Sequence, residues 1–258
     1  MRLDKFLAES AIGTRKVVRD YIKDGKVSVN DRSIVDPASE IDECRDIIRY
    51  LNKQVLYPGK VYYMFHKPTG CVTARKDLTM KTVLDYFPPD LRNMIFPIGR
   101  LDKDTEGLLL LSNDGNLEHQ LMHPDKHVEK TYFFWAFGTL DNKAKDCLKA
   151  GVVIEEDETV AKALKLQVEM VGTYQDYEEI MKLINVLSLK RKDNEQPVVS
   201  GYITISEGRR HQIKRMLKAV GCYVVYLKRV SIGKLMIDAE LKKGQYRELS
   251  REELNLLL

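Results

Sequence analysis

Hydrophobic positions along the chain follow two periods, one expected of strands and one expected of helices. Apolar runs, most of them rich in aromatic or β-branched residues, predict strands at 61–66, 107–113, 130–137, 201–206 and 222–227. Amphipathic stretches predict helices at 82–87, 116–122, 142–151 and 209–221. Because the strands are long and their connections short, the pattern favours an α+β domain with a mixed sheet over a βαβ nucleotide-binding repeat.

The first 56 residues have a pattern of their own. Helical spacing predicts a short helix at 3–7, and Thr14 can cap a second helix that ends before Gly25. This second helix carries one row of positive charge, formed by Arg15, Lys16, Arg19 and Lys23. An alternating run at 26–30, closed by an Asn-Asp pair, predicts a small hairpin. The row of cations could line a phosphate backbone or simply face solvent, and spacing alone leaves both possibilities open.

Composition excludes several classes of protein. The 258 residues are 44% hydrophobic and 31% charged, which is typical of a soluble globular chain. No run of 18 apolar residues is long enough to span a membrane, and the charged N-terminus lacks the apolar segment of a signal peptide, so a cytoplasmic protein is expected. The four cysteines form no CxxC pair and the five histidines no HExxH motif, so neither a disulfide framework nor a metal site is expected. No GxGxxG or GxxxxGK[ST] motif follows a strand, which leaves NAD and ATP unsupported.

Positive charge is concentrated in one segment rather than spread evenly. The net charge is only +4, yet residues 207–234 hold eight basic residues against one acid. Clustering of this kind favours a polyphosphate partner, with nucleic acid foremost.

Three carboxylates precede the strand predicted at 107–113. Asp102, Asp104 and Glu106 have the spacing that begins a calcium-binding loop, but the twelfth position is Asn113 instead of glutamate, and no helices are predicted on either side. Calcium is therefore not expected. An aspartate beside a buried strand is partly desolvated, so it needs a nearby cation to stay ionised.

Four stretches in order resemble the motifs of RNA pseudouridine synthases of the RsuA-like branch. They are "HKPTG" at 66–70, "GRLDKDTEGLLLLSNDG" at 99–115, "HPDKHVEKTY" at 123–132 and "SEGRRHQIKRMLKAVG" at 206–221. Any one of them alone would be a weak signal. Together they make the resemblance specific, and it extends over about residues 1 to 250.

The resemblance implies a fold class and a division of the chain. It implies an α+β protein, with a small S4-like α/β RNA-binding domain at 1–56, a linker at 57–61 and a pseudouridine synthase domain at 62–258. The sheet of the second domain is expected to be mixed and largely antiparallel. Residues 172–198 look like an insertion relative to the shorter bacterial members.

The same resemblance implies a reaction and its residues. Uracil is detached from ribose, turned and rejoined through carbon without redox chemistry, so no cofactor is expected. Asp102 corresponds to the carboxylate that acts at the ribose, as nucleophile or base, and Lys214 to its countercharge. Tyr132 is expected to stack on the base, while Asp104 and Glu106 are expected to serve local structure. RNA contacts are expected from Arg100, Lys130, Arg209, Arg210, His211 and Arg215, and from the row Arg15, Lys16, Arg19 and Lys23.

The motifs indicate the substrate less specifically than they indicate the reaction. The motifs look most like the branch that modifies a uridine of small-subunit (16S) ribosomal RNA, and the expected partner is that RNA or a ribosomal assembly intermediate. A large-subunit enzyme, or a non-catalytic ribosome-assembly factor, remains an alternative. The protein is expected to be a monomer.

Overall fold

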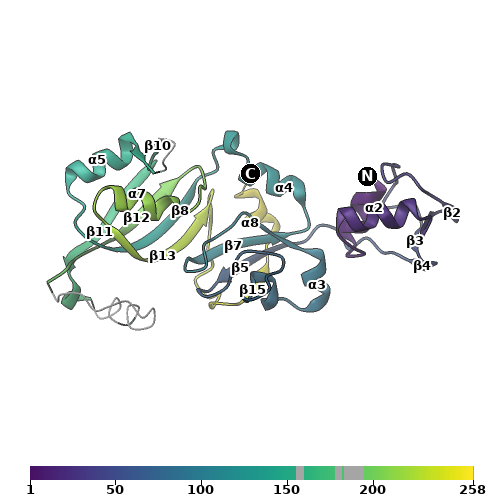
Figure 1. The fold of residues 1–258 in the computed structure, drawn as a ribbon, viewed down its shortest axis with the longest axis horizontal. Coiled ribbons are helices and arrows are strands. Elements are labelled where there is room, and N and C mark those ends of the chain that lie inside the picture. Colours follow the sequence, from purple (N-terminus) through teal and green to yellow (C-terminus); the bar gives the residue numbers. More distant parts are fainter. Residues whose placement is uncertain (155–159, 178–181, 183–194, 258) are drawn as a thin grey trace.

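The N-terminal unit is a pair of helices on a small sheet, at one end of the molecule (Figure 1). The computed structural model describes residues 1–154, 160–177, 182 and 195–257. The unit contains α1 (Leu3–Glu9), α2 (Arg15–Lys23), β1 (Val27–Val29), β2 (Arg32–Ser33), β3 (Ile48–Tyr50) and β4 (Lys53–Gln54), with strand order β2-β1-β3-β4. Thr14 caps α2 through its side chain, which accepts from the Val17 amide. Asn30 and Asp31 both have positive φ, which suits the tight turn between β1 and β2. The predicted helices and hairpin are confirmed.

The rest of the chain is built on a sheet of nine strands. Its order is β11-β12-β8-β13-β7-β5-β15, with β14 paired to β13 and β6 to β7. The strands are β5 (Tyr62–Lys67), β6 (Phe96–Ile98), β7 (Glu106–Ser112), β8 (Lys130–Phe137), β11 (Lys165–Thr173), β12 (Pro197–Ile205), β13 (Tyr223–Ile232), β14 (Leu235–Met236) and β15 (Tyr246–Glu248). Among the described strands of this sheet, only β13 and β7 pair in parallel. The expected mixed, largely antiparallel sheet is confirmed.

Helices and short turns cover this sheet. They are α3 (Pro89–Met94), α4 (Gly115–Met122), α5 (Asn142–Ala150), α7 (Gln212–Ala219), α8 (Arg251–Asn255), η1 (Val83–Tyr86), η2 (Pro124–Lys126) and η3 (Tyr174–Asp176), and β9 (Val152–Val153) pairs with β10 (Val160–Ala161). Two predictions differ from the structure. The helix predicted at 82–87 is the 3₁₀ turn η1, because Pro88 and Pro89 follow it and prevent its extension. The helix predicted at 209–221 begins only at Gln212, because His211 is left-handed.

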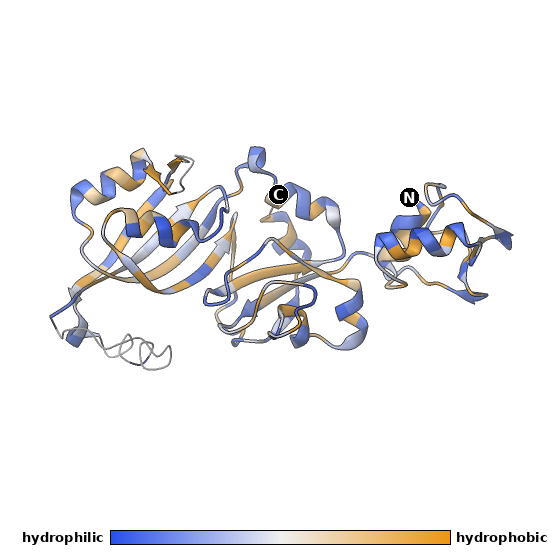
Figure 2. Ribbon diagram, viewed as in Figure 1, coloured by the Kyte–Doolittle hydropathy of each residue, from blue (hydrophilic) through white to orange (hydrophobic). Residues whose placement is uncertain are grey.

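The four leucines of β7 are all buried because both faces of this strand are covered. Leu109 and Leu111 pack into the cluster that includes residues of α5 and α7. Leu108 and Leu110 pack on the other face, against residues of α4. A strand covered on both faces is expected to be continuously hydrophobic, as this one is. Figure 2 shows β7 as a hydrophobic strand through the middle of the molecule.

The two halves of the sheet meet where β13 lies between β8 and β7. Arg229 of β13 is opposite Tyr132 of β8 on one side and Gly107 of β7 on the other. Gly107 has φ +104°, and a Cβ built there would lie 2.2 Å from the Arg229 carbonyl oxygen. Only glycine allows this close approach. The junction therefore brings the loop before β7 next to β8.

Two further expectations concern membrane-spanning helices and the insertion at 172–198. None of the described helices has the length and the hydrophobicity to cross a bilayer. The insertion expected at 172–198 falls largely on residues 178–181 and 183–194, which lie outside the described residues.

Candidate active site

The loop that carries Asp102 is held from below by a buried lysine. Residues 99–105 connect β6 to β7, and Lys67 at the end of β5 is fully buried beneath them. Its Nζ donates to the carbonyl oxygens of Asp102 at 3.0 Å and Thr105 at 2.9 Å, and also to those of Pro68 and Lys103. Burial lowers the pKa of Lys67 below its ordinary value. No role was expected for Lys67 from the sequence, although a lysine at the end of a buried strand is itself unusual, because lysine is rarely fully buried without partners.

Asp102 shares its cation with a neighbouring carboxylate. Lys214 Nζ lies 3.7 Å from Asp102 Oδ2 but 2.5 Å from Asp104 Oδ1, and His211 Nε2 lies 3.7 Å from Asp102 Oδ1. The Asp102 side chain is 28% exposed and that of Asp104 61%. Asp104 was expected to serve local structure only, but it holds the direct hydrogen bond to Lys214.

The pKa of Asp104 reflects this contact. Burial raises the pKa of the Asp104 carboxyl, but the hydrogen bond and charge of Lys214 outweigh that effect and leave it below its ordinary value. Glu106, in contrast, is structural as expected: it is buried, accepts from Tyr226, and pairs with Lys243 at 2.8 Å. It lines neither of the two cavities described next.

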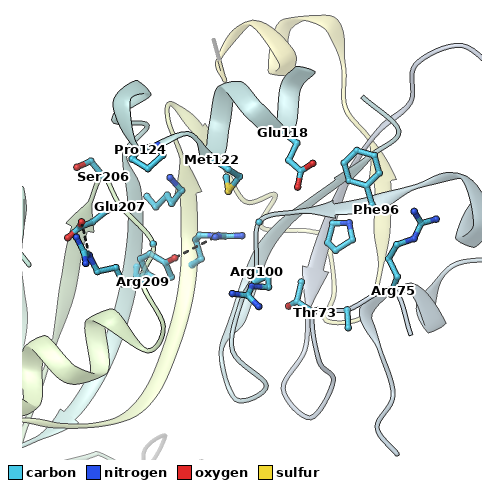
Figure 3. A pocket seen from close by; sticks show the side chains of 17 residues that line it. Thr73, Arg75, Phe96, Arg100, Glu118, Met122, Pro124, Ser206, Glu207 and Arg209 are labelled. Carbon is cyan, nitrogen blue, oxygen red and sulfur yellow. Dashed lines mark hydrogen bonds and ion pairs between the residues drawn. The ribbon is translucent and has the colours of Figure 1, made fainter. Parts of the chain in front are cut away.

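Two adjoining cavities open beside the loop that carries Asp102. The smaller, of about 60 Å³, is lined by Asp102, Tyr132 and apolar side chains that include Leu227. The larger, of about 790 Å³, shares Arg100, Tyr132, Gly208 and Arg209 with the smaller. Figure 3 shows its two walls: Arg75, Phe96, Arg100 and Glu118 on one side, and Ser206, Glu207 and Arg209 on the other. Asp102 and Tyr132, 30 positions apart, therefore meet at one cavity.

Strand β8 and its neighbour β13 supply the floor of the larger cavity. Tyr132 and Lys130 are both buried. Lys130 donates to the carbonyl oxygens of Val128 at 3.0 Å and Leu121 at 3.4 Å. Burial, helped by the charge of Arg229, lowers the pKa of Lys130 to about 8.

Arg229 also belongs to this site, although the sequence placed it only in the general basic cluster. It is 1% exposed, its Nε donates to the Leu108 carbonyl oxygen at 2.7 Å, and its Nη1 donates to the Tyr132 hydroxyl at 3.5 Å. Arg229 lies just beyond the strand predicted at 222–227, so its membership of the basic segment 207–234 was the available signal.

The other predicted RNA contacts are dispersed. Arg209 lines both cavities and pairs with Glu207 at 3.2 Å, whereas Arg210 and Arg215 line neither. Arg209, Arg210 and His211 do not open a helix, contrary to the prediction, because they lie in the turn before α7 and His211 caps it without a side-chain bond.

The basic row of α2 lies outside these two cavities. All four side chains are exposed, and Arg19 also pairs with the buried Asp4 at 2.8 Å.

Comparison with known proteins identifies the family. Residues 61–219 match the family model described as RNA pseudouridylate synthase, and residues 1–47 match the S4 domain. The chain belongs to the RNA pseudouridylate synthase family. It is an isomerase, with an S4 domain at its N-terminus.

Similar proteins cover the synthase from end to end. It is 39% identical to an uncharacterized RNA pseudouridine synthase of Bacillus subtilis, over 100% of this chain and 98% of that one. It is 33% identical to ribosomal small subunit pseudouridine synthase A of Escherichia coli, over 98% of each chain. It is 32% identical to ribosomal large subunit pseudouridine synthase B of Bacillus subtilis, over 99% and 95%. A crystal structure of a pseudouridylate synthase matches with a TM-score of 0.63 and 30% identity, over the whole of both chains.

Among the residues that the structure describes, no group of three histidine, cysteine, aspartate or glutamate side chains is placed to hold a metal ion. The roles of Asp102, Tyr132 and Lys214 in the reaction stay predictions.

Proposed function

We propose that this synthase converts a uridine of small-subunit ribosomal RNA to pseudouridine, with Asp102 acting at the ribose. The observation that carries the proposal is the small cavity that Asp102 and Tyr132 line together, beside Lys214 and His211. The Asp102 carboxylate has the positive charge of Lys214 close to it and faces a cavity, which suits it to act as nucleophile or base at the sugar.

Each remaining step of the reaction has a residue beside it. A uridine must leave its stack to reach the cavity, at a cost of a few kcal/mol. Arg100, exposed and lining both cavities, can occupy the place that the uridine vacates or hold its phosphate. Tyr132 stacks on the released uracil, which is turned and rejoined through carbon 5. The proton displaced from that carbon then leaves with the help of Tyr132 or a relay from it.

The RNA substrate is proposed from the relatives and from charge. The small-subunit enzymes of several bacteria share 30–33% identity with this chain. The large-subunit enzyme of Bacillus subtilis, at 32%, keeps the second candidate open. We further propose that the protein acts in the cytoplasm as a monomer, on ribosomal RNA or an assembly intermediate, through an S4-like unit at 1–56 joined by a linker at 57–61 to a catalytic unit at 62–258.

Mapping pseudouridines in ribosomal RNA tests this proposal. Cells that lack the gene should lose one pseudouridine from small-subunit RNA, and the wild-type gene should restore it. Asp102→Asn should fail to restore it, whereas Asp90→Asn, which changes an exposed aspartate of α3, should succeed.

Three outcomes would contradict parts of the proposal separately. Restoration by Asp102→Asn would remove the assigned role of Asp102. A lost site in large-subunit RNA would select the second candidate. No lost site in either RNA would reject ribosomal RNA as the substrate.

A further inference from the structure

The floor of the larger cavity holds two buried cations with no carboxylate partner. Lys130 is 6% exposed and Arg229 1%. Among the described residues, the hydrogen bonds of both side chains go only to neutral oxygens, which are main-chain carbonyls and the Tyr132 hydroxyl. Nη2 of Arg229 is buried and has no hydrogen-bond partner within the described part of the chain. A buried charge is costly unless an opposite charge compensates it, and here two like charges are neighbours.

The other charged groups of the cavity do not neutralise this pair. Arg75, Arg100 and Arg209 add positive charge, and Glu207 is paired with Arg209 at 3.2 Å. Glu118 is the remaining acid, and burial raises its pKa, which disfavours its charged form. The cavity therefore has an excess of positive charge at its floor, where both cations are buried.

We infer that Lys130 and Arg229 form an anion site that binds a phosphate group attached to the uridine in the active site. This inference rests on the proposed function, because it takes the uridine to lie against Asp102. Tyr132 lines both cavities, so a nucleoside that reaches Asp102 in the smaller cavity lies next to the larger one. Nε of Arg229 is held by the Leu108 carbonyl oxygen at 2.7 Å, whereas the hydrogen bond from Nη1 to the Tyr132 hydroxyl is long at 3.5 Å, so an anion would compete only with this weaker bond. Its planar fork suits phosphate oxygens.

Nucleotide binding to the full-length protein separates a phosphate site from a base site. Isothermal titration with uridine, uridine 5′-phosphate and uridine 3′-phosphate should show one phosphate preferred over uridine by about tenfold or more, as expected for charge-assisted hydrogen bonds. Arg229→Gln and Lys130→Gln should each reduce that preference to about threefold or less and leave uridine binding unchanged. Lys143→Gln, on the exposed side of α5, is the matched control and should keep the full preference.

Every other result overturns the inference. Equal affinities for uridine and both nucleotides, or no phosphate-dependent binding, would show that no phosphate site exists. An equal loss of uridine binding in the variants would assign the pair to the base. Should Arg229→Gln fail to fold, Lys130→Gln and the preference of the wild-type protein decide the matter.

The result is independent of the ribosomal RNA assay. A phosphate preference that depends on the pair, together with no lost pseudouridine in either ribosomal RNA, would reject the proposed function alone. A restored pseudouridine with no phosphate preference would reject this inference alone.

Discussion

At the scale of single residues, Lys214 is positioned between two carboxylates. It bonds Asp104 directly and lies 3.7 Å from Asp102, and all three side chains retain some exposure. Lys214→Met should lower the rate of pseudouridine formation by about 100-fold or more, because it removes the cation beside Asp102. Its effect on stability should be near 1 kcal/mol, typical of exposed pairs, instead of the 3–5 kcal/mol of a fully buried one. Single-turnover assays and urea unfolding measure the two effects.

Asp104→Asn is the matched comparison. It leaves Lys214 free to approach Asp102, so the rate should fall by no more than about tenfold. A loss as large as that of Lys214→Met would mean that the carboxylate served by Lys214 is Asp104.

The buried Lys130 predicts how the free energy of unfolding depends on pH. Its pKa falls from 10.5 to about 8 on folding, so between these values the unfolded chain binds more protons than the folded one. The free energy of unfolding should therefore rise with pH across this window, by up to about 3 kcal/mol. Below pH 8 the lysine is charged in both states, and its burial costs stability throughout.

The difference between wild type and Lys130→Met isolates this effect from other groups that titrate in alkali. Urea unfolding of the two proteins at pH 7.5, 9 and 10 should show the rise from this group only in wild type. Parallel curves would contradict the lowered pKa.

At the scale of elements, local pattern predicted five of the nine strands of the large sheet and most of the described helices, because hydrophobic period is a local property, but it missed β6, β11, β14 and β15. The run of leucines predicted a buried strand, and Thr14 predicted the start of α2. The pattern could not predict roles that depend on contacts between residues distant in sequence. Nothing beside Lys67 or Arg229 in sequence shows that the first lies beneath the Asp102 loop or that the second lies beside Tyr132. The resemblance of the ordered motifs to a known family predicted that Asp102 and Tyr132 share one site, which spacing alone could not have predicted.

The hydrogen bonds from Lys67 Nζ, called here the Lys67 clamp, connect the end of β5 to the loop before β7. Lys67→Met would remove the charged donor shared by four carbonyl oxygens, although those of Asp102 and Lys103 would keep the main-chain amides of Thr105 and Gly70 as donors. We expect a loss of about 2–4 kcal/mol in the free energy of unfolding, because buried hydrogen bonds from a charged group are lost. The rate should also fall by about 100-fold, because the loop that carries Asp102 would shift. Both are measured well below the unfolding temperature.

Lys76→Met, an exposed lysine further along the same connection, is its control and should change neither quantity. A Lys67 variant with wild-type stability and rate would show that the loop holds its position without the clamp.

At the scale of the whole molecule, the S4 domain and the catalytic cavities are connected by a third cavity. Its volume is about 420 Å³, and it is lined by Glu9, Thr14 and Arg15 of the N-terminal unit together with Asn113 and Asn116 of the catalytic unit. It shares Arg75, Phe96 and Glu118 with the larger active-site cavity. An RNA strand that leaves the active site past these residues would therefore reach the start of α2.

This path divides the basic row of α2 into residues that should bind RNA and one that should not. Arg15 is exposed and lines the third cavity, whereas Arg19 is held by Asp4, which is 1% exposed. Arg15→Gln should weaken RNA binding and lower the slope of log K against log salt by about 0.7 to 0.9, the contribution of one phosphate contact. Arg19→Gln should leave that slope nearly unchanged and reduce stability instead, because Asp4 would keep only Arg2 as its partner. Filter binding at several salt concentrations, beside thermal unfolding, compares the two variants. Equal losses of slope would mean that Arg19 leaves Asp4 for the RNA, and an unchanged slope in Arg15→Gln would place the strand on another course.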